Sequence, residues 1–356
     1  MLKLLGIGLG LFLINLVACQ KQAEFDKQDL LETIITTYVM DSYADAVTTA
    51  SALEQALNQF TTAPDLVKLE TAQAAWKKSM EAWSKVEGLN FGPGRNQYRY
   101  LQLDNTPVRS PSIEAALADT TPIDLPYLQQ RGSYTKGLAT IEYLLFGAGN
   151  NAAILQGYQS DALAARRCAY VYYSGVHVSE LLNALTEEWK DSYATELASQ
   201  TDNSSTGGIA RFSNVLLHLS QTIARKKVGK PLGKESGTGA IQPTLVESPY
   251  AEHSWAIIHA NLLGLQALFG TEKNGMGSYL AHLLGDNSNT KKIAEQLDKL
   301  VTLTDNRMAS LKMELTTQNA AVESVYEELK LLYNLLEEDY LPYVSITLLT
   351  NPDDGD

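Results

Sequence analysis

The chain of 356 residues contains two cysteines and an excess of acidic over basic side chains. Cys19 and Cys168 are too few for a disulfide scaffold, a cysteine-rich zinc site or an iron–sulfur cluster. We expect Cys168 to be a buried, inert thiol on a helix face. With 28 Lys and Arg against 41 Asp and Glu, the formal net charge is −13. We therefore expect no nucleic-acid partner, because proteins that follow a phosphate backbone depend on clustered cations.

The sequence also lacks a Gly-x-Ser-x-Gly nucleophile elbow, a phosphate-binding loop and the His-Glu-x-x-His pattern of zinc peptidases. Strands with alternating polar and apolar residues are missing as well. At 45% apolar and 19% charged residues, the composition is that of a folded globular chain rather than a disordered one. These absences exclude several enzyme classes and favour a helical protein.

One long apolar run, Leu4 to Ala18, lies near the start of the chain. Its length of about 15 residues is below the ~20 that a membrane-spanning helix needs. The run ends in Leu16-Val17-Ala18-Cys19, which resembles the lipobox of bacterial lipoproteins. We expect residues 1–18 to be a lipoprotein signal peptide and Cys19 to carry the lipid. Gln20 after the cysteine favours the outer membrane, so the mature protein would be attached there by lipid and face the periplasm.

Beyond the signal segment, Ala, Leu, Gln, Glu and Lys dominate, and apolar residues recur at helical spacing. Leu69, Trp76 and Trp83, for example, follow one another at intervals of seven residues, which predicts a helix with one buried face. One helix is expected to begin at Pro64, and the others cover residues 24–61, 134–146, 161–198, 209–228, 254–269, 291–317 and 322–349.

A polar, glycine-containing stretch over residues 201–208 predicts a linker between two domains. The expected N-terminal helical-bundle domain covers residues 19–200 and the C-terminal one residues 209–350. Each contains a helix that ends in Leu-Phe-Gly, at 145–147 and at 268–270. The sequence therefore predicts an all-α fold of two four-helix-bundle-like domains that arose by internal duplication.

Residues 88–132 differ from the rest of the N-terminal half, because they carry five prolines, one of them in a Gly-Pro-Gly turn. This composition predicts a long irregular excursion from the bundle. Long ordered segments of this kind often carry function.

Glu142 is the most informative acidic residue. Its neighbours three and four positions away on a helix, which are Leu138, Ala139, Leu145 and Phe146, are all apolar. A carboxylate in such surroundings either faces a ligand or is buried, and burial requires a partner, a proton or a metal. An ion pair with an arginine, from Arg166, Arg167 or Arg211, is the structural alternative.

The segment around Glu142 resembles part of a known family. Residues 137–147, Gly-Leu-Ala-Thr-Ile-Glu-Tyr-Leu-Leu-Phe-Gly, are similar to the signature helix of the imelysin family, whose motif is Gly-x-His-x-x-Glu. Further similarities follow in the order that the family shows. They are Ala75-Trp76, Trp83, Glu87, Phe91-Gly92-Pro93, Pro231-Leu232-Gly233-Lys234, Ser254, Ala260-Asn261-Leu262 and Gly264-Leu265.

The resemblance implies two helical domains with the signature helix near a cleft between them. Family members have been classed as metallopeptidases, and relatives serve envelope iron uptake. In this chain the motif histidine is replaced by Ala139, so the expected site has lost its nitrogen ligand. A zinc peptidase normally needs three protein ligands and an open water position. The replacement therefore argues against peptidase activity.

We expect Glu142 to be a ligand acceptor or a weak metal ligand, and Gly137 to allow close packing at a ligand-binding site. Arg99 and Arg109, from the irregular excursion, are the expected counter-charges. If a metal binds, the resemblance suggests iron or zinc.

The first functional hypothesis is a non-enzymatic, imelysin-like lipoprotein that binds a ligand or partner and serves iron acquisition together with envelope iron-transport proteins. The second is a metallopeptidase that uses Glu142 with ligands outside the motif. His177 and Glu180 are three residues apart and could face one point on a helix. His253 and His259 are poorer candidates, because six residues place them on different faces. The third hypothesis is a purely structural envelope protein in which Glu142 closes an ion pair inside the bundle.

Overall fold

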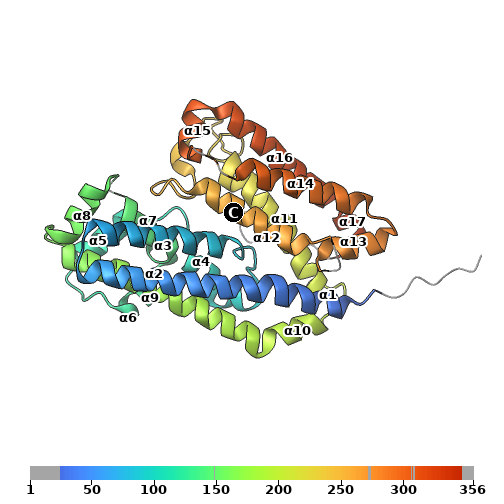
Figure 1. Cartoon of the computed structure of the whole chain (residues 1–356), viewed down its shortest axis with the longest axis horizontal. Coiled ribbons are helices and arrows are strands. Elements are labelled where there is room, and N and C mark those ends of the chain that lie inside the picture. The colour runs from blue at the N-terminus through green and yellow to red at the C-terminus, as the bar shows by residue number, and fades with distance from the viewer. Residues whose placement is uncertain (1–24, 148, 272–273, 306, 308, 347–356) are drawn as a thin grey trace, which may run out of the picture.

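The computed structural model describes residues 25–346 except 148, 272–273, 306 and 308 (Figure 1). The described residues form helices, turns and loops and contain no strand, which confirms the prediction of an all-α fold. None of their helices is long and apolar enough to cross a membrane. The expected signal peptide and Cys19 lie outside the described residues.

Three long helices build the N-terminal half. α1 (Lys27–Ile34) continues through a π-helical segment (Ile35–Met40) into α2 (Asp41–Thr62). Together these segments form the continuous helix that was expected over residues 24–61. α3 (Leu66–Ser84) returns along α2, and α9 (Ala164–Glu188) packs on the other side of α2 (Figure 1). α9 continues through a second π-helical segment (Trp189–Tyr193) into α10, Ala194–Ser199.

The segment 88–132 is more ordered than the sequence suggests. It contains α4 (Arg99–Leu103), α5 (Ser110–Ala118) and α6 (Leu125–Gln129), and each of these short helices packs against α9. Prolines lie in the first turns of α5 and α6, where the missing N–H costs nothing. The expectation of an irregular excursion is therefore wrong for about half of this stretch. The structure also adds α8 (Asn151–Gln159), which the sequence reading missed.

The C-terminal half is a second bundle, coloured yellow to red in Figure 1. α11 (Gly208–Thr222) passes into a π-helical segment (Ile223–Gly229), and α12 (Ser254–Phe269) and α16 (Asn319–Asp339) pack on it. α14 (Ser288–Thr304) packs against both α12 and α16. Three shorter helices complete this half, and they are α13 (Met276–Leu284), α15 (Leu311–Thr317) and α17 (Leu341–Val344).

The expected helix over residues 291–317 is broken into α14 and α15, because Ser310 caps the start of α15. The internal duplication is not confirmed: the two helices that end in Leu-Phe-Gly differ in length, with 9 residues in α7 (Leu138–Phe146) and 16 in α12.

The two halves meet where α12 packs on the C-terminal end of α3. Gly264 permits this approach, since a Cβ atom there would lie 2.3 Å from the carbonyl oxygen of Lys85. Asn261 donates a hydrogen bond to the carbonyl oxygen of Ser84 at 2.6 Å, and the hydroxyl of Tyr38 donates to that of Lys85 at 2.9 Å. These contacts fix the end of α3 and, with it, the surroundings of α7.

Candidate functional site

The signature helix α7 is preceded by Gly137, at a position that only glycine can occupy without strain. Its φ of +82° lies in the region that L side chains avoid, and an added Cβ would lie 2.4 Å from the carbonyl oxygen of Leu103. Trp76 of α3 donates its indole N–H to the carbonyl oxygen of Leu138 at 2.8 Å. The same indole packs edge-on against Phe146. Gly137 and Trp76 therefore set the position of α7.

Glu142, in the middle of α7, is only 2% exposed. Its Oε1 accepts hydrogen bonds from Ser248 Oγ at 2.8 Å, Tyr250 N at 2.9 Å and Ala251 N at 2.8 Å. All three donors belong to one segment of the C-terminal half, residues 247–253, which we call the clamp loop. Glu142 thus connects the signature helix of one half to a loop of the other.

Further contacts hold the clamp loop in place. Lys312 of α15 donates to the carbonyl oxygen of Pro249 at 2.9 Å, and the rings of Tyr143 and Tyr250 meet edge-on at 5.4 Å. Glu252 has a φ of +54°, which is a strained backbone conformation for a residue with a side chain. The loop is therefore held by several independent contacts and contains one residue in a strained backbone conformation.

Burial raises the pKa of Glu142 to about 7, against the opposing effect of the three hydrogen-bond donors and of Lys312. The carboxyl group therefore changes charge close to neutral pH. Its backbone donors from Tyr250 and Ala251 are suited to the ionised form, whereas its apolar surroundings favour the neutral one.

A second polar group lies at the same junction and centres on Lys227, which belongs to the π-helical segment after α11. Its ammonium group contacts Glu87 Oε1 at 2.6 Å and Glu247 Oε2 at 2.9 Å, and it donates to Asn261 Oδ1 at 2.8 Å. Asp104, after α4, belongs to the same electrostatic cluster. We call these five residues the Lys227 cluster. The carboxylates hold the pKa of Lys227 above its usual range despite burial.

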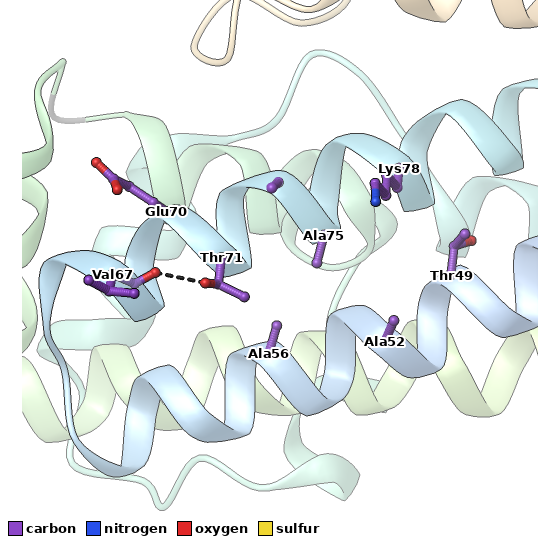
Figure 2. Close-up of a pocket in the computed structure, with 9 residues that line it drawn as sticks. Thr49, Ala52, Ala56, Val67, Glu70, Thr71, Ala75 and Lys78 are labelled. Carbon is purple, nitrogen blue, oxygen red and sulfur yellow. Dashed lines mark hydrogen bonds between the residues drawn. The ribbon is translucent and has the colours of Figure 1, made fainter.

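The structure contains two cavities among the described residues that merit comparison with the junction. One, of about 300 Å³, adjoins the clamp loop. It is lined by Glu252, His253, Trp255, Ala256, His259, Thr304, Asp305, Arg307, Ala309 and Ser310. The other, of about 540 Å³, lies between α2 and α3 (Figure 2). Its lining is mostly small residues and includes no residue of the clamp loop.

The structure places His253 and His259 on the same cavity, although their spacing suggested different faces. His253 precedes the first turn of α12, so the helical angle between the two does not apply. Each ring already has a partner: His253 Nε2 lies 2.7 Å from Glu81 Oε1, and His259 Nδ1 lies 3.1 Å from Thr304 Oγ1.

The predicted counter-charges lie elsewhere. Arg99 pairs with Glu188, and Arg109 lies over the ring of Tyr134 at 4.7 Å. The expectation that either arginine balances Glu142 is therefore wrong, and Lys312 is the cation whose charge acts on it. The arginine ion pair considered as the alternative is wrong too, because Arg166, Arg167 and Arg211 all have other contacts. These are backbone carbonyls for Arg166, Glu114 for Arg167 and the ring of Phe91 for Arg211.

His177 and Glu180 do not form a metal site. His177 is buried, and burial lowers its pKa to about 4, whereas Glu180 is exposed to solvent. The two side chains therefore cannot meet one ion. Within the part of the chain that the structure describes, no three His, Cys, Asp or Glu side chains are arranged to hold a metal.

The signature helix itself does not fit a metal either. Ala139 offers no ligand, and Oε1 of Glu142 is occupied by three hydrogen-bond donors. Cys168, on α9, is partly buried, and burial raises the pKa of its thiol, which disfavours the reactive thiolate.

The fold and this junction define a helical protein of two bundles joined through a carboxylate on a short signature helix. The sequence profile of the imelysin family (Peptidase_M75) matches residues 39–339, and the chain therefore belongs to the imelysin family.

Solved structures resemble the chain along most of its length. An imelysin-like protein from Psychrobacter arcticum superposes with a TM-score of 0.75 at 20% identity, covering 91% of this chain and 97% of that one. A putative iron-regulated protein A precursor from Parabacteroides distasonis gives 0.70 at 16% identity, covering 89% and 95%. At these identities the similarity shows the fold.

Among curated proteins, the Iron-regulated protein A of Synechococcus elongatus is 28% identical over 131 residues. That match covers 37% of this chain and spans only 35% of the relative's length.

Several residues of the junction escaped the sequence reading. Ser248, Tyr250 and Ala251 lie at the end of a glycine- and proline-containing stretch that gave no periodic signal. Glu87 and Asn261 are the members of the Lys227 cluster that lie in the segments similar to the imelysin family.

Replacing Glu142 by Ala should lower the free energy of unfolding by about 2–3 kcal/mol, because the N–H groups of Tyr250 and Ala251 lose their acceptor. Urea denaturation measures this change. The matched control is Glu180→Ala, an exposed glutamate on α9, which should alter stability by less than ~0.5 kcal/mol. Equal effects of the two substitutions would show that the clamp-loop contacts do not form.

Proposed function

We propose that this chain is a lipid-anchored envelope protein of the imelysin family that binds a ligand or partner beside the clamp loop and serves iron acquisition without acting as a peptidase. The observation that carries the proposal is the hydrogen bonding of the Glu142 carboxylate. In the family motif this glutamate accompanies a histidine, whereas here it holds the clamp loop through three hydrogen bonds.

The chemistry of the site supports binding over hydrolysis. Metal-assisted hydrolysis needs several ligands and a coordinated water. The replacement of the motif histidine by Ala139 removes one ligand, and the clamp loop occupies an oxygen of another. The cavity of about 300 Å³ next to the loop is large enough for a small ligand, and Trp255, Arg307 and two histidines are among the residues that line it.

The link to iron rests on relatives. One partial relative is named Iron-regulated protein A, and one protein of similar fold is titled a putative iron-regulated protein A precursor. The proposed location at the periplasmic face of the outer membrane, and the proposed contact with envelope iron-transport proteins, rest on the lipobox-like sequence before Cys19 and on this family context.

Restoring the motif histidine should create a metal site. In Ala139→His, the new imidazole and Glu142 share one face of α7, three residues apart. Competition with a zinc-binding dye should show zinc affinity at least about tenfold above that of the native protein, or ~1.4 kcal/mol. Ala139→Leu is the control for steric change, and circular dichroism checks that both variants fold. A native protein that already binds zinc or iron as tightly as the variant, or that cleaves casein in a chelator-sensitive manner, would contradict the proposal.

The anchor and the role in iron supply are tested in cells that lack the native gene. We expect the deletion to slow growth when an iron chelator is added and the native gene to restore growth. Cys19→Ser should abolish labelling by radioactive palmitate and release the protein from the membrane fraction. Unchanged labelling of the variant would refute the anchor, and chelator-resistant growth of the deletion strain would refute the iron role.

A further inference from the structure

Two partly buried acidic side chains at the junction of the halves have enclosed oxygen atoms. Asp104 follows α4 in the N-terminal half, and Glu247 begins the clamp loop in the C-terminal half. Among the described residues, Asp104 Oδ1 has no hydrogen-bond partner, and both this atom and Glu247 Oε2 are enclosed. Glu247 Oε2 has an ion-pair partner, Lys227 Nζ, at 2.9 Å. An enclosed acceptor without a donor is costly.

The charges around these two groups do not balance. Four carboxylates act on one another here, those of Glu87, Asp104, Glu142 and Glu247. The opposing cations are Lys227, in contact with Glu87 and Glu247, and Lys312, which acts on Glu142. If all four acids were ionised, the junction would hold four negative charges against two positive ones. Buried charges without partners are strongly unfavourable.

We propose that Asp104 and Glu247 form a proton-binding site at the junction, and that the proton held there stabilises the packing of the two halves against each other. The proton supplies the missing donor to one of the enclosed oxygens and removes one unbalanced negative charge. The site goes beyond the proposed function, since it requires neither a ligand nor a membrane anchor.

The electrostatics of both groups agree with this site. Burial, followed by the charge of Glu247, raises the pKa of Asp104 well above its usual range. Burial likewise raises the pKa of Glu247 to about 7, with Glu87 and Glu142 acting in the same direction and Lys227 opposing them. The two carboxyl groups titrate together, so the proton belongs to the pair.

The direction of the pH effect follows from linkage. A carboxyl group whose pKa is higher in the folded than in the unfolded chain stabilises the fold while it is protonated. That stabilisation is complete below the unfolded value of about 4.5 and is lost as the pH rises through about 7. The packing of the halves should therefore be tighter in mild acid and weaker in mild alkali.

Urea denaturation between pH 5.5 and 8.5 tests the site, with Asp104→Asn, Glu247→Gln and the exposed control Glu180→Gln. For the native protein, the folding equilibrium constant should fall from pH 5.5 upward by about tenfold per pH unit for each proton that the folded chain holds and the unfolded chain has lost, and this fall should end once the pH exceeds the pKa values of the folded pair. If each carboxyl group holds its own proton, each amide variant should lower the slope of the folding equilibrium constant against pH by the equivalent of one proton. If the pair shares a single proton, either amide variant should remove that proton's whole contribution to the slope. Glu180→Gln should leave the slope unchanged. Slopes in both amide variants equal to the native one would overturn the proposal.

A second measurement does not depend on the folding of the variants. In native protein with ¹³C-labelled aspartate carboxyl groups, one resonance should titrate far above the others. A spectrum in which every aspartate titrates near its ordinary pKa would also overturn the proposal. If Glu142→Gln alone removes the whole pH dependence, the proton resides on Glu142, and the assignment to Asp104 and Glu247 is wrong.

Discussion

The hydrogen bonds between Glu142 Oε1 and the clamp loop are the interaction on which the arrangement of the junction depends. One buried oxygen accepts three donors from a segment more than a hundred positions away in the sequence. Two of the donors are backbone N–H groups, so their direction is set by the path of the loop rather than by side-chain rotation. The carboxylate therefore specifies both where the loop lies and how it is oriented.

Other contacts fix the positions of α7, which carries Glu142, and of the clamp loop. Gly137 lets the chain approach Leu103 closely enough to start α7 at the right point, and Trp76 ties the first turn of α7 to α3. On the other side, Lys312 holds the loop at Pro249. The Lys227 cluster then joins the same two halves through ion pairs that are almost fully buried. Such pairs contribute to a specific arrangement more than to net stability.

The sequence was sufficient for the fold class and for one member of the site. Helical periodicity predicted the long helices, and apolar neighbours at three and four positions predicted that Glu142 is special. The partners of Glu142 could not be predicted, because Ser248, Tyr250 and Ala251 contribute mainly backbone groups from a loop without periodicity. Arg99 and Arg109 were chosen by charge alone. Charge in a sequence gives no information on distance, and both arginines have nearer partners. The lipid anchor and the internal duplication remain predictions.

The central claim is that Glu142 holds the clamp loop across the junction, and amide hydrogen exchange of the native protein tests it directly. The N–H groups of Tyr250 and Ala251 are only partly buried and lie in a loop, where exchange is normally fast. The account predicts slow exchange at both amides, comparable with that of the core of α12. Exchange as fast as that of an open surface loop would contradict it.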